Sequence, residues 1–130
     1  MKTGGNDEGS FDIYFNISVS IAVICETRAS RKWYQEKWCE AHKGQVEVVL
    51  PNGTRCDCLT DTHAIEFEFG NNWAEAVGQS AHYSLQTKKK PGVVLILETI
   101  KDRKYWIRLN TTIEHFNLPI DTWNVGNATY

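Results

Sequence analysis

The chain has 130 residues, of which 42% are hydrophobic, and 14 Lys and Arg against 16 Asp and Glu give a formal net charge of -2. This length fits one domain, and five Trp, five Tyr and five Phe exclude an intrinsically disordered chain. The near-neutral charge excludes a polybasic nucleic-acid binder, and the absence of a long uninterrupted apolar run predicts no membrane partner. We expect a polar tail over residues 1–10 and a single domain over residues 11–130.

The segment from Phe11 to Cys25 has a hydrophobic residue at every odd position, which is the period of a β-strand. A strand of this length should break, curl or pair with another copy of the chain, so one hypothesis is a homodimer through residues 11–25. The residues before it are acidic, whereas a secretory signal begins with basic residues. We therefore expect a structural role for the segment, with export as the alternative.

The next elements predict an α/β domain with a mixed sheet, in the order helix, three strands, helix, strand over residues 30–98. Ser30 is suited to cap a first helix that ends near His42. The pair Asn52-Gly53 favours a tight reversal between the first two strands. The three strands are predicted over residues 45–50, 55–59 and 64–69.

The second half of the chain begins with a helix expected from Asn72, a suitable N-cap, to about Thr87. Five consecutive aliphatic residues at 93–97 predict a buried central strand. Weaker patterns predict a strand over 104–109 and a short helix over 111–117, and the last dozen residues give no clear signal. The helix after Asn72 is expected to pack through an apolar face made of Ala74, Val77, Ala81 and Leu85.

Four cysteines, Cys25, Cys39, Cys56 and Cys58, allow either disulfides or buried thiols. Cys56 and Cys58 are two residues apart on one predicted strand, so they are expected on one face and should not bridge each other. No second pair of ligands has the spacing of a zinc motif. We expect buried thiols, with a Cys39–Cys58 bridge as the open alternative.

Three acidic side chains are expected to converge on the predicted sheet. Glu66 and Glu68 share one face of the third strand, and Asp57 lies in the middle of the neighbouring strand. Like charges at close range destabilise a fold unless a cation neutralises them, and Mg²⁺ prefers oxygen ligands. On the following helix, Gln79 and Tyr83 are four residues apart and could orient a phosphate. The alternative interpretation is a solvated outer face of the sheet.

Together these residues resemble the PD-(D/E)XK nuclease superfamily, with its restriction-endonuclease-like fold, and in particular the RecB-like branch with its Gln-x-x-x-Tyr motif. The resemblance covers residues 30–98 and implies an αβββαβ core, here with an extra long N-terminal strand. It implies metal-dependent hydrolysis of DNA or RNA, with Mg²⁺ as cofactor. The implied metal ligands are Asp57, Glu66 and an acid of the first helix, Glu40 or Glu36. The implied catalytic residues are Asp57, Glu66, Glu68, Gln79 and Tyr83.

The run from Arg55 to Glu66 is similar to small uncharacterised bacterial proteins, some of them from mobile gene cassettes. The sequence does not define the location; the bacterial cytoplasm is slightly favoured over export. One position departs from the family motif, because Glu68 stands where a Lys would stabilise developing negative charge. Three explanations stay open. Lys88 or Lys43 could substitute for the motif Lys, Glu68 could help to hold a second metal ion, or cleavage could be lost.

Two other functions remain as alternatives. One is a non-catalytic, dimeric interaction or nucleic-acid-binding protein on the same fold. The other is a small-molecule binding module lined by Trp33, Trp38 and Trp73.

Basic residues gather near the second half of the chain. Residues 88–108 hold seven basic and two acidic residues, so this segment carries +5 and the rest of the chain carries −7. Such a segment suits DNA or RNA phosphates, and Tyr105 and Trp106 could stack on bases. The alternative is a solvated rim. The predicted phosphate contacts are Lys88, Lys89, Lys90, Lys101, Arg103 and Lys104.

Overall fold

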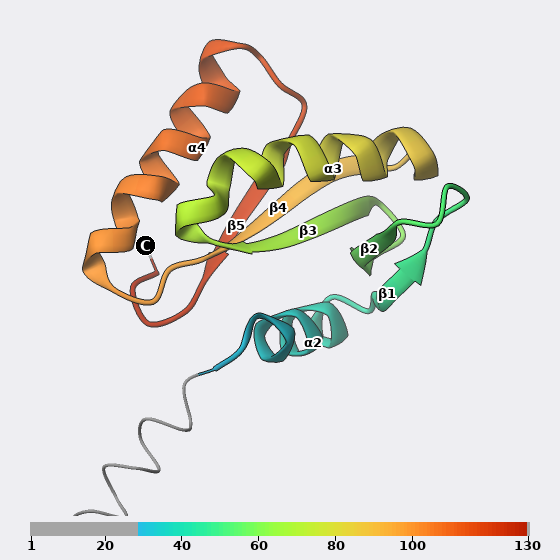
Figure 1. Ribbon diagram of the computed structural model, residues 1–130, viewed down its shortest axis with the longest axis horizontal. Helices are drawn as coiled ribbons and strands as arrows, with labels where there is room; N and C mark the ends of the chain where they lie inside the picture. The colour runs from blue at the N-terminus through green and yellow to red at the C-terminus, as the bar shows by residue number, and fades with distance from the viewer. Residues whose placement is uncertain (1–28, 130) are drawn as a thin grey trace, which may run out of the picture.

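The computed structural model describes residues 29–129, which form a five-stranded mixed sheet with helices on both faces (Figure 1). The strand order β1-β2-β3-β4-β5 follows the sequence, with antiparallel pairing from β1 to β3 and parallel pairing from β3 to β5. The predicted α/β class and the order of elements over residues 30–98 are confirmed. The helices are α2 (Arg31–Ala41), α3 (Trp73–Thr87) and α4 (Arg103–His115), with short 3₁₀ turns at Gly70–Asn72 and Ile100–Asp102. The strands are β1 (Gln45–Val49), β2 (Arg55–Leu59), β3 (His63–Phe69), β4 (Lys90–Ile96) and β5 (Asp121–Val125).

The tail at residues 1–10, the strand over 11–25 and the homodimer through that strand lie outside the described residues, as does Cys25. None of the helices between residues 29 and 129 has both the length and the apolar character needed to cross a lipid bilayer.

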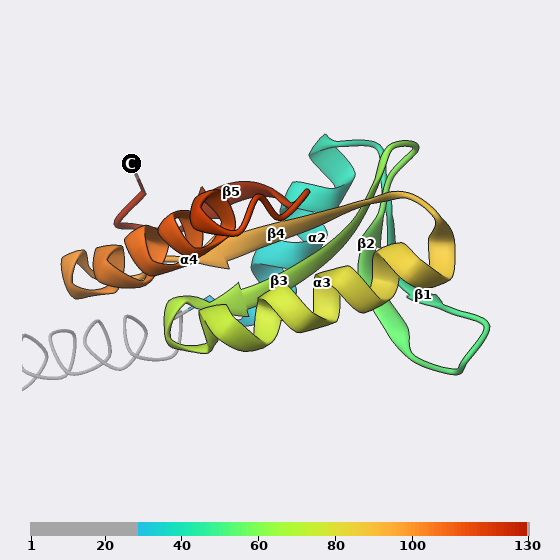
Figure 2. The same cartoon turned by 90° about the horizontal axis from the view of Figure 1, so that it is seen from above.

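The sheet lies between two layers, with α3 and α4 on one face and α2 on the other (Figure 1, Figure 2). Val93 and Leu95 of β4 point into the α3/α4 layer, where Leu109 of α4 packs against them. Val94 points into the α2 layer and packs with Phe67 of β3. Because successive side chains of a strand alternate between faces, β4 contributes to both layers, as expected for a buried central strand.

The segment after β4 corrects the prediction for residues 104–117, because it forms the single helix α4 instead of a strand followed by a short helix. Trp106, Leu109 and Ile113 recur every three or four residues and therefore share one helix face, which packs on the core. The fifth strand lies in the last dozen residues, for which no local pattern predicts an element. The packed core therefore extends beyond residues 30–98.

Helix α3 also differs in the face that it buries. Its buried residues are Ala76, Ser80 and Tyr83, whereas Leu85, expected in the packing face, is 73% exposed. Of the four residues predicted to pack, Val77 contacts the core, and Ala74 and Ala81 are exposed. Strand β4 begins at Lys90, three residues earlier than predicted.

A disulfide joins Cys39 of α2 to Cys58 of β2, while Cys56 is a buried free thiol. Cys56 packs against Tyr83 of α3, on the other side of the sheet, so the predicted common face for Cys56 and Cys58 is wrong. The β2–β3 ladder pairs Cys58 with Ile65 and does not continue to Asp57. Where β2 leaves the ladder, the regular alternation of side chains is interrupted.

Candidate functional site

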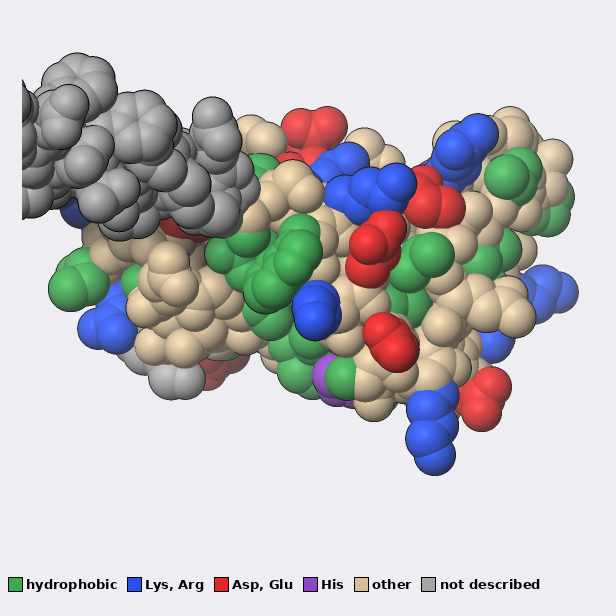
Figure 3. All heavy atoms as spheres, turned by 90° about the horizontal axis from the view of Figure 1, so that it is seen from below, with side chains coloured by type: hydrophobic (Ala, Val, Ile, Leu, Met, Phe, Trp, Pro, Cys, Tyr) green, Lys and Arg blue, Asp and Glu red, His purple; other side chains and the backbone are tan. Residues whose placement is uncertain are grey.

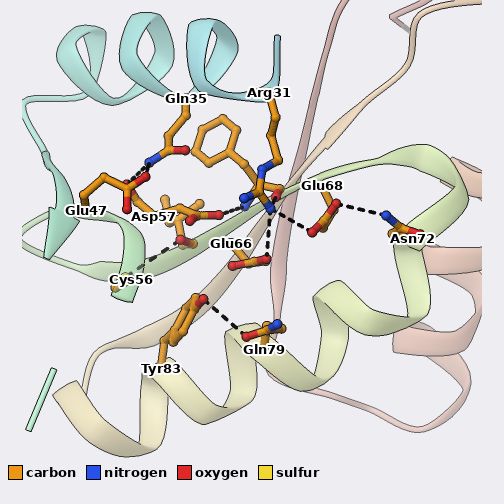
Figure 4. Close-up of polar contacts among 12 residues, drawn as sticks. Arg31, Gln35, Glu47, Cys56, Asp57, Glu66, Glu68, Asn72, Gln79 and Tyr83 are labelled. Carbon is orange, nitrogen blue, oxygen red and sulfur yellow. Dashed lines mark hydrogen bonds and ion pairs between the residues drawn. The ribbon is translucent and has the colours of Figure 1, made fainter. Parts of the chain in front are cut away.

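A gap opens between β2 and β3 beyond the Cys58–Ile65 pair, and polar side chains fill it (Figure 4). Asp57 Oδ2 accepts a hydrogen bond from the backbone N–H of Phe67 at 2.8 Å, in place of a strand-to-strand bond. Gln35 of α2 donates to the carbonyl oxygen of Asp57 at 2.8 Å and to Glu47 Oε1 at 3.0 Å. These side-chain contacts satisfy backbone groups that the sheet leaves unpaired.

The three predicted acids, Asp57, Glu66 and Glu68, meet in this gap, and we call them the acid cluster (Figure 4). All three are buried, so a solvated outer face of the sheet is excluded as their explanation. Asp57 and Glu66 are near enough to share a side-chain hydrogen bond when one of them is protonated. The predicted convergence of the three carboxyl groups is therefore present.

Arg31, the first residue of α2, brings a positive charge to the acid cluster. Its Nη1 lies 2.8 Å from Glu68 Oε1 and 3.9 Å from Glu66 Oε1, and it also donates to the carbonyl oxygen of Phe67 at 3.2 Å. Burial opposes the charge of Arg31, but the neighbouring carboxylates of the acid cluster outweigh this effect and raise its pKa. Arg31 therefore stays charged and partly neutralises the acids.

Glu66 is the most buried of the three acids, with 2% of its surface exposed. Burial, the charge of Asp57 and the hydrogen bond shared with Asp57 raise the pKa of Glu66 from 4.5 to about 9. Its Oε2 has no hydrogen-bond partner within the described part of the chain. A proton on Glu66 at neutral pH supplies a donor that the ionised pair lacks, so Glu66 and Asp57 titrate as a pair. Burial also raises the pKa of Asp57.

Gln79 and Tyr83 adjoin the acid cluster from the α3 side, as Figure 4 shows. The Tyr83 hydroxyl donates to Gln79 Oε1 at 3.3 Å. Burial and the nearby charge of Glu66 raise the pKa of Tyr83, so its phenol remains a neutral hydrogen-bond donor. Gln79 and Tyr83 thus lie where a group bound at the cluster would meet them.

Glu40 does not join the acid cluster. It is exposed and lies nine residues from Arg31, which places it on the opposite side of α2 at 3.6 residues per turn. Lys43 and Lys88, the candidates for a substitute lysine, are also exposed and form no ion pair with the described acids.

The sequence prediction missed Arg31 and Gln35, which α2 presents to the acid cluster in place of Glu40. Their spacing of four residues puts them on one helix face, and this was the signal available in the sequence. Nothing local to the sequence showed that this face would meet the gap between β2 and β3.

A fit to Mg²⁺ depends on what the carboxyl groups already bind. Between residues 29 and 129, no three His, Cys, Asp or Glu side chains are arranged to hold a metal ion. Asp57 is engaged by Phe67, and Glu68 is engaged by Arg31 and by Asn72 Nδ2 at 3.3 Å. The donor set is nevertheless that of a hard cation, and the unpartnered Oε2 of Glu66 is a free ligand atom. By its chemistry the donor set suits Mg²⁺, but a bound ion would have to replace Arg31 and the proton on Glu66.

The predicted basic segment is divided by β4 into two groups about 20 Å apart, because a seven-residue strand has that length. In the first group, Lys89 Nζ donates to the carbonyl oxygen of Thr60 at 2.6 Å, and Lys90 Nζ lies 3.3 Å from Asp121 Oδ2. The face seen in Figure 3 shows Lys and Arg interspersed with Asp and Glu, without a patch of one sign. The groups are Lys88, Lys89 and Lys90 at the start of β4, and Lys101, Arg103 and Lys104 after the strand.

The three tryptophans proposed to line a small-molecule site do not share one. Trp38 packs against Phe67 and Trp123 in the α2 layer, whereas Trp73 packs in the α3/α4 layer. Trp33 is exposed on α2. Of the three tryptophans, Trp38 lines a groove of about 270 Å³ together with Trp123.

No protein-family model, curated protein or solved structure matches the chain. The chemistry of the acid cluster therefore has to be argued from its own geometry and electrostatics.

Proposed function

We propose that the chain is a Mg²⁺-dependent phosphodiesterase of the PD-(D/E)XK class that acts on DNA or RNA. The observation that carries the proposal is the burial of Asp57, Glu66 and Glu68 in one gap of the sheet, with an oxygen of Glu66 left unpartnered. The αβββαβ order of α2 to β4 agrees with the restriction-endonuclease-like core that the resemblance implies. A buried, incompletely neutralised carboxyl group destabilises a fold and is typical of a functional site.

In this proposal, the carboxyl groups bind the metal ion, and the neighbouring amide and phenol orient the phosphate. Asp57, Glu66 and Glu68 would hold Mg²⁺ through carboxylate oxygens. When bound, Mg²⁺ would polarise the phosphate ester and activate water as a nucleophile. Gln79 and Tyr83 offer an amide and a phenol beside the cluster, where they would orient a phosphate oxygen by hydrogen bonding.

The basic group after β4 is the better candidate for contacts with the nucleic-acid backbone. Glu68 pairs in register with Leu95, close to the end of β4, so Glu68 lies nearer along the strand to this group than to the lysines at the start of β4. Lys101 and Lys104 are exposed there, whereas Arg103 is held by the carbonyl oxygen of Ala128 at 3.2 Å. Exposed lysines suit phosphate contacts of this kind.

The test is cleavage of end-labelled single- and double-stranded DNA and RNA in Mg²⁺, in Mn²⁺ and in EDTA. The wild-type chain should cleave at least one substrate in a metal-dependent manner. Asp57→Ala and Glu66→Ala should each lose at least about 100-fold in rate, because each removes metal-held stabilisation of the transition state. Glu40→Ala is the matched control, since this exposed acid lies on the far side of α2, and it should keep full activity. A folded wild-type chain that cleaves none of these substrates would overturn the proposal.

A second candidate is a non-catalytic interaction or nucleic-acid-binding protein on the same core. It is favoured by Arg31, which already neutralises part of the acid cluster at 2.8 Å from Glu68. This candidate predicts binding to DNA or RNA that weakens steeply with salt and is not accompanied by cleavage. Binding measured by fluorescence anisotropy between 50 and about 200 mM salt, on the same substrates, separates the two functions.

A further inference from the structure

Arg31 and the acids that it contacts differ sharply in their access to solvent. The Arg31 side chain is 41% exposed, whereas Glu66 is almost completely buried. Arg31 is the first residue of α2, and Ser30 Oγ caps this helix by accepting from the N–H of Trp33 at 3.1 Å. Because the cap and the helix do not depend on the guanidinium, the Arg31 side chain can swing into solvent while α2 stays folded.

The ion pairs of Arg31 leave the acid cluster incompletely satisfied. One guanidinium carries a single positive charge, and its Nη1 contacts Glu68 closely but lies 3.9 Å from Glu66 Oε1. Glu66 Oε2, buried and directed into the gap, has no hydrogen-bond partner among residues 29–129. A compact divalent cation carries twice the charge and can bind several oxygens at once, which a planar guanidinium on one side of the cluster cannot do.

We propose that Arg31 is an internal counter-ion that occupies the acid cluster in the metal-free protein and is displaced into solvent when a divalent cation binds to Asp57, Glu66 and Glu68. The inference rests on the proposed function, because it assigns the regulation of that same site. Arg31 and the cation would share the oxygens Glu68 Oε1 and Glu66 Oε1 and would repel each other at contact distance, so they exclude one another.

Two contacts keep the displacement local to the side chain. The Cys39–Cys58 disulfide ties α2 to β2, and Gln35 holds the carbonyl oxygen of Asp57 from the next turn of the helix. Helix α2 therefore remains in place when Arg31 leaves, and the freed guanidinium stays at the rim of the cluster. A guanidinium at that position is suited to bind a phosphate oxygen of an incoming substrate.

The test is isothermal titration of the full chain with MgCl₂ and MnCl₂, for the wild type and three variants. Arg31→Gln should bind the cation about tenfold more tightly than the wild type, because the competing charge is removed. Arg31→Lys keeps a competing charge and should bind like the wild type. Lys32→Ala removes the neighbouring cation, which is 73% exposed and pairs with Glu36, so its affinity should stay within about twofold.

Equal or weaker binding in Arg31→Gln would overturn the displacement. If Arg31→Gln does not fold, the Nε–Hε resonance of Arg31 in the wild type replaces it as the readout. This resonance should shift toward the position of a solvated arginine as MgCl₂ is added, and an unchanged resonance during saturating binding would overturn the inference.

Cleavage measured on the same samples separates this inference from the proposed function. Wild-type cleavage together with unchanged affinity in Arg31→Gln overturns displacement and leaves the phosphodiesterase proposal standing. Tighter binding in Arg31→Gln without cleavage supports displacement and overturns the phosphodiesterase proposal. Absence of metal binding in both the wild type and Arg31→Gln overturns both.

Discussion

The two halves of the sheet are held together by different interactions. Between β4 and the helices α3 and α4, the residues of the packed core cluster are apolar, and Val93, Leu95 and Leu109 are fully enclosed. Between α2, β2 and β3, the same sheet buries a disulfide, an amide and the carboxyl groups of the acid cluster. The first half is stabilised by the burial of apolar surface, which contributes about 25 cal/mol for each Å² removed from water.

The second half does not have the side chains that would stabilise it most. A buried ion pair can often be replaced by packed hydrophobic residues without loss of stability. A chain selected for stability alone would therefore fill the gap between β2 and β3 with apolar side chains. The difference between the halves teaches that stability alone does not explain the acid cluster, which agrees with the proposed function, and three substitutions test this comparison.

The largest effect is expected in the apolar half. Leu95→Ala removes a fully buried side chain of β4 and should lower the free energy of unfolding by about 2–5 kcal/mol, measured by urea titration. Leu85→Ala is the matched control, because Leu85 of α3 is exposed, and it should change the stability by less than about 0.5 kcal/mol. A loss below about 1 kcal/mol in Leu95→Ala would show that the apolar half does not dominate stability.

An intermediate effect of opposite sign is expected in the polar half. Because the pKa of Glu66 is raised to about 9 in the folded chain, the stability contributed by its protonated form is full below pH 4.5 and is lost as the pH rises through 9. Glu66→Gln keeps a neutral side chain, so at pH 9 it should be more stable than the wild type by about 1–3 kcal/mol, with a smaller difference at pH 5.

The measurement is urea unfolding of both proteins between pH 5 and pH 9. Glu36→Gln serves as the control, since Glu36 is exposed on α2, and its curve should run parallel to that of the wild type. A difference between Glu66→Gln and the wild type that does not change with pH would contradict the buried, protonated state of Glu66.

The smallest effect is expected at the surface, where the side chains of His63 of β3 and Asp121 of β5 meet across β4. Asp121 Oδ2 lies 2.6 Å from His63 Nε2, and this hydrogen bond lowers the pKa of Asp121. A lowered pKa gives stability that is present above pH 3.8 and is lost as the pH falls through the folded value. Because Asp121 is 44% exposed, Asp121→Asn should cost about 0.5 kcal/mol at pH 7 and nothing near pH 2, measured by thermal unfolding. Asp61→Asn, an exposed control, should cost nothing, and an equal loss in both variants would assign the effect to surface charge alone.

The elements from α2 to β4 could be predicted because each has a clear local pattern. Alternating residues in β3 placed Glu66 and Glu68 on one face, and the structure confirms that they meet Asp57. Helix α4 was missed because Tyr105 and Trp106 favour a strand locally, whereas its spacing over thirteen residues is helical.

The partners of the acid cluster could not be predicted, because they depend on tertiary structure. Arg31 meets Glu68 beside the part of β2 before Cys58 that does not pair with β3, and no local pattern indicates this missing pairing. The sequence also did not show that the basic residues of this segment form two separate groups, and the reason is related. Residues 88–108 are close in sequence, but the extended strand β4 carries their two ends apart.

The disulfide between Cys39 and Cys58 closes a covalent ring across a sequence separation of 19, and the whole of β1 lies inside it. Four of the five residues of β1 are exposed, so this edge strand has little buried surface to keep it paired. Local opening can therefore free β1 from β2 while the ring still fixes α2 to the sheet. Because Gln35 of α2 also donates to Glu47 of β1, opening of β1 removes one contact of this helix, but the disulfide keeps α2 attached to β2 above the acids.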